Sequence, residues 1–229
     1  MTASTIELLN AGDHAELRLG PPSGPPPHFV QIVLDELAGA ASICPIFLTK
    51  SPETGAFYVG AMLGFKADEA VLVDTAERSG TFDPLDWARR GFYVSGEQIA
   101  IDAGDPRFAD PAGEPMFERD GRPAPALVNM TRTLGRLKAG MDATQAFVDA
   151  MLAHKLVEAI DVSLDFDDGE RLNLAGLYTI SLDSLGELDD AAALALFRAG
   201  HLQAAYIMSQ SLRQVARLAR RRNERLAAG

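Results

Sequence analysis

The sequence predicts an α+β protein with a central, mostly antiparallel sheet built from hairpins, packed with several helices and ending in a long C-terminal helix. Two observations predict this class. Short apolar runs in the first half of the chain are separated by turns rich in glycine and proline. Apolar residues then recur at three- and four-residue spacing through most of the second half, as they do along one face of a helix. Because strands come mainly before helices, a regular α/β alternation is not expected.

Turn residues indicate three hairpins, the second of which could also be a bulged strand pair. The first has CPIFLTK and AFYVGAMLGF around SPETG, the second has FYV and QIAID around SGE, and the third has Asp168-Gly169 as its turn. Two further strands are expected in FVQIVL and EAVLVD. In the third hairpin, the pattern places four apolar residues on one face of the return strand: Leu172, Leu174, Tyr178 and Ile180.

Helices are expected over residues 126–139, 142–157, 189–199 and 202–226. Gly140 is expected to end the first of them, because glycine is common just past a helix C-terminus. Asp142 with Gln145 is close to a capping box for the second. Asp189 and Gly200 are expected to cap and to stop the third.

Composition and charge limit the function classes. The chain has 229 residues and a net charge of −11, so nucleic-acid phosphates would be repelled and no nucleic-acid partner is expected. The single cysteine, Cys44, lies in an apolar run and is expected to be a buried side chain. The apolar stretches reach roughly 10 residues, short of the roughly 20 that a transmembrane segment needs. With no secretory-signal pattern at the start, a cytoplasmic protein is expected.

The proline-rich stretch PPSGPPPH sets the expected domain boundary. Proline fixes φ and removes a backbone donor, so this stretch is expected to be extended and exposed, either as a linker or as a ligand for a groove-type partner. We therefore expect an extended leader over residues 1–28 and a single α+β domain over residues 29–229.

No metal site and no cofactor are expected. The acidic residues of 161–170 supply the oxygen ligands that calcium prefers, but the apolar residues between them alternate as in a strand with one solvated face. His14 and Glu16 form an H-x-E motif, which on its own is too short to indicate an iron site. His154 and Glu158 are four residues apart and are expected to form an ordinary pair on a helix surface.

The C-terminal segment is strongly basic. Six arginines between residues 213 and 225, with the single acid Glu224, give it a local charge of +5 in an acidic chain. Cations near a helix C-terminus interact favourably with the helix dipole, so a solvated helix end is one interpretation. Docking of this segment on the acidic body or on a second subunit is the other.

Three of the four candidate ligand-binding residues lie near the only tryptophan, in WARRGFYVSGEQIAID over residues 87–102. Arg89 and Arg90 are candidate clamps for an anion, because a guanidinium binds two carboxylate or phosphate oxygens at once. Tyr93 and Tyr178 complete the candidate set. On an extended chain, neighbouring arginines point to opposite faces, so at most one is expected to reach a shared pocket. No catalytic residue is assigned, because the chain has neither a G-x-S-x-G elbow nor a Walker-type glycine loop.

Four stretches in order resemble the SapC-like family of bacterial proteins: WARRGFYVSGEQIAID, GEPMFERDGRPAPAL, LNLAGLYTIS and LFRAGHLQAAYIMSQSL. The resemblance covers residues 29–222 and depends mainly on Arg89 to Phe92, on Phe117 to Gly121 and on Gly176 to Tyr178. Family members often have a longer segment with a Tyr-x-Pro before the arginines, which is absent here. The family differs from a peptide-transporter permease of the same name.

The resemblance implies an association with a bacterial surface-array layer. Members of the family are also often encoded near TonB-dependent receptors and flavin-dependent halogenases. We expect a non-catalytic accessory or binding protein, forming a homo-oligomer and taking a small anionic or peptide ligand. The alternatives are an enzyme that modifies a peptide or small anionic metabolite, and a structural assembly subunit.

Overall fold

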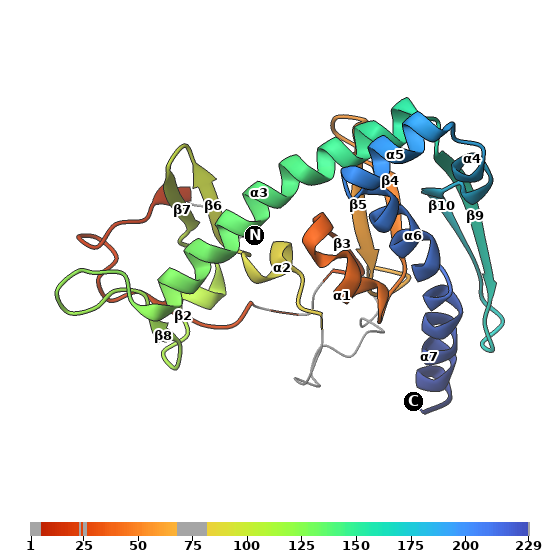
Figure 1. The fold of residues 1–229 in the computed structure, drawn as a ribbon. Helices are drawn as coiled ribbons and strands as arrows, with labels where there is room; N and C mark the ends of the chain where they lie inside the picture. The colour runs from red at the N-terminus through yellow and green to blue at the C-terminus, as the bar shows by residue number, and fades with distance from the viewer. Residues whose placement is uncertain (1–5, 23, 25–26, 68–81, 229) are drawn as a thin grey trace. The chain divides into compact units, whose positions relative to one another are not determined.

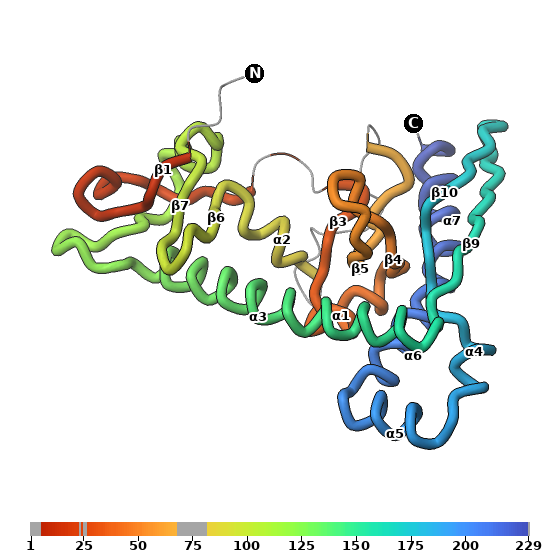
Figure 2. Tube along the Cα trace, turned by 90° about the horizontal axis from the view of Figure 1, so that it is seen from above, coloured from red at the N-terminus to blue at the C-terminus, as the bar shows by residue number. Residues whose placement is uncertain are grey.

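The structure is a computed structural model that describes residues 6–22, 24, 27–67 and 82–228 (Figures 1 and 2). Its antiparallel sheets and helices confirm the α+β class. By its internal contacts the chain divides into two units. The first contains Met1–Pro25 and Leu85–Ala139, and the second contains Pro26–Pro84 and Gly140–Gly229.

The first unit is built on a small antiparallel sheet with the strand order β1-β7-β6. Its elements are β1 (Ile6–Leu8), β2 (Arg18–Leu19), α2 (Leu85–Ala88), β6 (Phe92–Ser95), β7 (Gln98–Asp102), the 3₁₀ turn η2 (Pro106–Phe108), β8 (Glu114–Pro115) and the first part of α3 (Pro125–Ala153). The β6–β7 pairing confirms the second expected hairpin. Its core contains Phe92, Ile101, Phe108, Met116, Phe117, Leu127, Met130 and Leu134.

Part of the expected leader is folded into this unit. β1 pairs with β7, and β2 pairs with β8, so residues on both sides of the predicted boundary share one structure. The sequence showed no strand signal there, because each of these strands is only two or three residues long. Contacts within the structure do not test whether residues 29–229 fold without residues 1–28. The division into a leader over 1–28 and a domain over 29–229 therefore stays a prediction.

The second unit is built on a five-stranded antiparallel sheet with the strand order β3-β5-β4-β10-β9. The strands are β3 (Phe29–Gln31), β4 (Ile46–Lys50), β5 (Phe57–Met62), β9 (Val157–Asp165) and β10 (Arg171–Ile180). The pairings β4–β5 and β9–β10 confirm the first and third expected hairpins. EAVLVD lies outside the described residues.

A bulge changes the expected face pattern of β10. Its pairing with β9 shifts between Leu174 and Leu177, and Gly176 there has φ +75°. Because the bulge adds one residue to β10, the face that carries Leu174 continues with Leu177, and Tyr178 turns to the opposite face. The prediction that Leu172, Leu174, Tyr178 and Ile180 share one face was therefore wrong.

The helix α3 is continuous where the sequence predicted a stop. It runs from Pro125 to Ala153 through Gly140, so the expected helix end at Gly140 and the capping box at Asp142 were wrong. Gly140 is buried, and a Cβ built on it would lie 2.7 Å from Cβ and Cγ2 of Val33. Close packing, and not a helix end, therefore explains this glycine.

The helices of the second unit lie beside its sheet. They are the 3₁₀ turn η1 (Leu34–Glu36), α1 (Leu37–Ala41), the end of α3, α4 (Leu182–Gly186), α5 (Asp190–Arg198), α6 (His201–Ser211) and α7 (Gln214–Ala228). Of these, α6 packs against β4 and β10, and α1 packs against β4. The Asp189 carboxylate accepts from the Ala192 N–H at 2.8 Å, and Gly200 has φ +75°, which confirms both expected signals around α5. The predicted C-terminal helix is present, but it is divided into α6 and α7 at residues 212–213.

The two helical glycines of α3 give a matched test of this packing. Gly135→Ala is expected to raise the free energy of unfolding by about 0.5–1 kcal/mol, because nothing lies within 4 Å of the added Cβ and alanine favours helix. Gly140→Ala is expected to lower it by about 1–3 kcal/mol, because the new methyl overlaps Val33. Urea denaturation followed by circular dichroism measures both. Equal effects of the two changes would contradict the packing role.

Cys44 gives a second test. It is fully buried, its thiol donates to the Ala40 carbonyl at 3.3 Å, and burial raises the pKa of the thiol to about 12. The native protein is expected to leave Ellman's reagent unreacted at pH 8 and to titrate one thiol only after unfolding. Ser42→Cys, which places a thiol at an exposed position nearby, is the positive control. Rapid labelling of the native wild type would contradict this burial.

Candidate functional site

The candidate arginines lie in a turn, not on a strand. The Arg89 N–H donates to the Leu85 carbonyl and the Arg90 N–H donates to the Trp87 carbonyl, so both residues continue the end of α2. Gly91 then has φ +82°, and β6 begins at Phe92. The expectation that the two side chains alternate across an extended chain was therefore wrong.

Both arginines have partners inside the first unit. Arg89 pairs with Asp86, with Nη2 at 2.6 Å from Oδ1, and its Nη1 donates to the Phe92 carbonyl at 3.1 Å. Its guanidinium also lies over the Tyr93 ring, 5.9 Å from the centroid. Arg90 lies 5.1 Å from the centre of the Trp87 ring, with its Nε 3.8 Å from an Asp105 oxygen. These contacts pair Arg89 with Tyr93 and, separately, Arg90 with Trp87.

A buried arginine that the sequence did not single out binds the backbone on both sides of Arg89. Arg107 is 4 % exposed and donates to three backbone carbonyls, those of Gly20 at 3.2 Å, Ala88 at 2.9 Å and Arg90 at 2.6 Å. Burial lowers the pKa of this guanidinium, Asp105 opposes that shift, and Arg90 adds to it. Its signal was hidden because GDPRF lies in a connection without periodicity.

Tyr178, the fourth predicted residue, belongs to the second unit. It lies on β10, where its ring meets Phe57 edge-on at a centroid distance of 4.9 Å. Lys50 Nζ lies over both rings, 5.5 Å from the Tyr178 centroid and 4.9 Å from the Phe57 centroid. This tyrosine therefore takes part in a packed aromatic pair, and a ligand role for the four residues stays a prediction.

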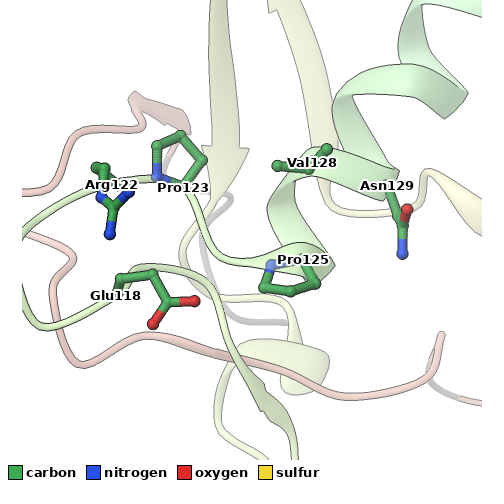
Figure 3. Close-up of a pocket in the computed structure, with 6 residues that line it drawn as sticks. All are labelled: Glu118, Arg122, Pro123, Pro125, Val128 and Asn129. Carbon is green, nitrogen blue, oxygen red and sulfur yellow. The ribbon is translucent and has the colours of Figure 1, made fainter.

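A pocket of about 550 Å³ opens at the start of α3 in the first unit (Figure 3). Glu118 and Arg122 lie at one end of it, and Val128 and Asn129 of α3 lie at the other. The tight turn beside it is closed by the Glu118 N–H, which donates to the Arg122 carbonyl at 2.8 Å. None of the four predicted site residues lines this pocket.

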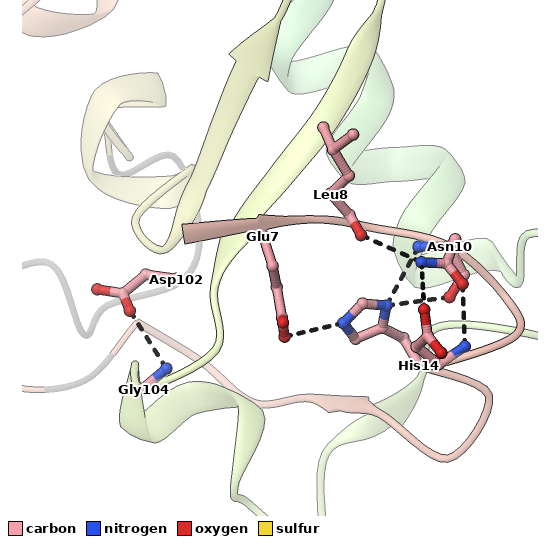
Figure 4. Close-up of polar contacts among 7 residues, drawn as sticks. Glu7, Leu8, Asn10, His14, Asp102 and Gly104 are labelled. Carbon is pink, nitrogen blue, oxygen red and sulfur yellow. Dashed lines mark hydrogen bonds and ion pairs between the residues drawn. The ribbon is translucent and has the colours of Figure 1, made fainter. Parts of the chain in front are cut away.

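His14 forms its polar contacts with Glu7 and Asn10 and not with Glu16 (Figure 4). The histidine is buried, with Nε2 3.0 Å from a Glu7 carboxylate oxygen and Nδ1 3.1 Å from the Asn10 carbonyl oxygen. His154 follows the end of α3 and Glu158 lies on β9, so the expected helix pair was wrong. Within the described residues, no group of three or more potential metal ligands comes together.

The basic C-terminal helix docks on the acidic hairpin. The Arg222 side chain is 5 % exposed, with Nη2 2.6 Å from Glu170 Oε2 and Nη1 3.5 Å from Asp168 Oδ2. Its guanidinium lies 4.1 Å from the centre of the Phe166 ring. Both views place α7 beside the β9–β10 hairpin (Figures 1 and 2). The docking interpretation of the basic segment therefore holds for this arginine.

A protein-family model described as SapC matches residues 9–218 of the chain. The match includes residues from both units. No curated protein matches the chain, and no solved structure matches it. Over the part of the chain that the structure describes, none of the helices combines the length and the apolar composition needed to cross a bilayer.

Arg107→Met tests whether this arginine holds the first unit together. Methionine keeps an unbranched side chain but removes the donors, so three backbone carbonyls, including that of the buried Gly20, lose a partner and the free energy of unfolding is expected to fall by about 2–4 kcal/mol. Arg119→Met, at an exposed position of the same unit, is expected to change stability by less than about 0.5 kcal/mol. The fluorescence of Trp87 reports unfolding of this unit. Equal stability of the two variants would contradict the role of Arg107.

Proposed function

This chain belongs to the SapC family, and we propose that it is a non-catalytic accessory protein that binds a protein partner in a bacterial cell-surface or TonB-dependent uptake system. We propose a cytoplasmic location, in keeping with the sequence expectation. The proposal assigns the recognition to exposed side chains of α5 and α6 in the second unit.

The exposure of aromatic residues on these two helices carries the proposal. Phe197 on α5 is 69 % exposed, and Leu194, three residues earlier, lies on the same face of the helix and is 46 % exposed. On α6, Tyr206 is 51 % exposed. All three occur within the stretch that carries the family resemblance, LFRAGHLQAAYIMSQSL, or directly before it.

The core does not require these side chains. α5 packs on the unit through Leu196, and α6 packs through Ala204, Ala205 and Met208. Large apolar side chains that stay in water cost free energy, and such side chains mark interaction surfaces when they gather. Aromatic residues are also enriched at the energetically dominant centres of protein interfaces. This support favours recognition of a protein over turnover of a metabolite.

The test is direct binding between the purified chain and each protein encoded beside its gene, measured by isothermal titration calorimetry. Phe197→Ser is expected to weaken binding to the partner at least tenfold, which corresponds to about 1.4 kcal/mol. Leu226→Ser is the matched control, because Leu226 is 43 % exposed and lies beyond the family match. It is expected to leave the affinity unchanged.

Two alternatives have distinct outcomes in the same experiment. If mass spectrometry shows that the chain converts a neighbouring protein, a peptide or an anionic metabolite, it is an enzyme and the proposal fails. Arg89, Arg90, Tyr93 and Tyr178 would then be the first residues to replace. If light scattering shows large assemblies that grow with concentration and dissolve in Phe197→Ser, the chain is a structural assembly subunit. A defined dimer is compatible with the accessory role and agrees with the expected homo-oligomer.

A further inference from the structure

A second open pocket, of about 460 Å³, lies in the second unit where α1, α6 and α7 meet. We name it the arginine pocket. Its polar lining includes Gln210, Arg213, Gln214 and Arg217, and its apolar lining includes Ala38 and Ile207. The family match includes the residues that line it but assigns them no ligand, and none of the four candidate ligand-binding residues lines it.

The sequence builds the pocket from a repeated Q-x-x-R pattern in QSLRQVAR, residues 210–217. The chain breaks between α6 and α7 at residues 212–213, within this pattern. Gln214 anchors the start of α7: it is 7 % exposed, and its Nε2 donates to the Ala41 carbonyl at 3.0 Å and to the Ser42 carbonyl at 3.1 Å. The buried amide therefore fixes α7 against the end of α1.

Gln210 and Gln214 accept hydrogen bonds from the two arginines of the pocket. Arg217 Nη1 donates to Gln214 Oε1 at 3.2 Å. Arg213 Nη2 donates to Gln210 Oε1, and its Nε donates to the Gln210 carbonyl at 3.1 Å. Each guanidinium is thus oriented by a neutral amide. An arginine has five N–H donors, so donors remain for a ligand on both side chains.

The charge of this pair is not offset by a carboxylate. Within the described part of the chain, neither Arg213 nor Arg217 forms an ion pair. Elsewhere on α7, Arg222 pairs with Glu170 at 2.6 Å and Arg220 pairs with Glu224 at 3.5 Å. Arg213 and Arg217 carry like charges and both line this pocket, so an anion bound there would reduce the repulsion between them.

We propose that the arginine pocket binds a small organic anion with a doubly charged oxyanion head, such as a phosphate monoester or a dicarboxylate. Guanidinium forks match both head groups, because each fork donates to two oxygens. The alanines and Ile207 take a short apolar body beside the head. The volume falls within the range of small-molecule sites. This inference does not depend on the proposed protein partner.

Calorimetric titration with phenyl phosphate, phthalate and inorganic phosphate tests the proposal. Phenyl phosphate is expected to bind more tightly than inorganic phosphate, because only the former also uses the apolar wall. Phthalate distinguishes a dicarboxylate site from a phosphate site. The double variant Arg213→Gln/Arg217→Gln is expected to lower the affinity for phenyl phosphate at least tenfold, with its fold checked by circular dichroism.

Two control variants separate the pocket from general electrostatics. Arg220→Gln/Arg225→Gln removes two charges from the same helix outside the pocket, and is expected to change the affinity less than threefold. Ala38→Trp keeps every charge, fills the pocket from an exposed position of α1, and is expected to abolish phenyl phosphate binding. The proposal is overturned if the wild type binds none of the three probes at millimolar concentration. It is also overturned if both double variants lose affinity equally, or if Ala38→Trp binds as the wild type does.

Discussion

The continuity of α3 is the constraint on which both units depend. Its first part supplies Leu127, Met130 and Leu134 to the core of one unit, and its last part supplies Phe147 and Met151 to the core of the other. Glycine inside a helix weakens it by up to about 1 kcal/mol relative to alanine. The chain accepts this cost at Gly140 because a larger residue would displace the fully packed Val33.

The hairpins and the fold class could be predicted because their signals are local. Asp168-Gly169 specifies a tight turn through two adjacent residues, and the alternation on either side specifies the strands. The end of a helix is different, since glycine marks either a C-terminus or a close approach of another segment. At Gly140 the deciding contact comes from a residue more than 100 positions away, a distance over which periodicity gives no information. The bulge at Gly176 was missed because it lies inside a strand, where a prediction from alternation assumes that no residue is added.

The candidate site was only partly predictable. Side-chain chemistry pointed to Arg89, Arg90 and Tyr93, and the structure pairs Arg89 with Tyr93 and Arg90 with Trp87. It did not identify Arg107, because its partners are carbonyl oxygens, and every residue carries one. The motifs behind the family resemblance contain glycines that the backbone conformation requires. Gly91, Gly121 and Gly176 all have positive φ, at +82°, +81° and +75°. These motifs therefore specify turns and, at Gly176, a strand bulge, which explains why they identify a family without identifying a reaction.

The arginines of this chain differ most in what compensates their charge. Arg107 is buried among carbonyl dipoles, and Arg222 is buried against two carboxylates and an aromatic ring. Both are structural: Arg107 satisfies the carbonyls of Gly20, Ala88 and Arg90, and Arg222 joins α7 to the β9–β10 hairpin. Arg213 and Arg217 are exposed and oriented by neutral amides. Because these amides hold the two side chains in place, the side chains have already lost part of the conformational entropy that ligand binding would otherwise cost. Among the described residues, their charges are not paired with a carboxylate. The type of partner, and not the number of basic residues, therefore separates arginines that stabilise this fold from those available to a ligand.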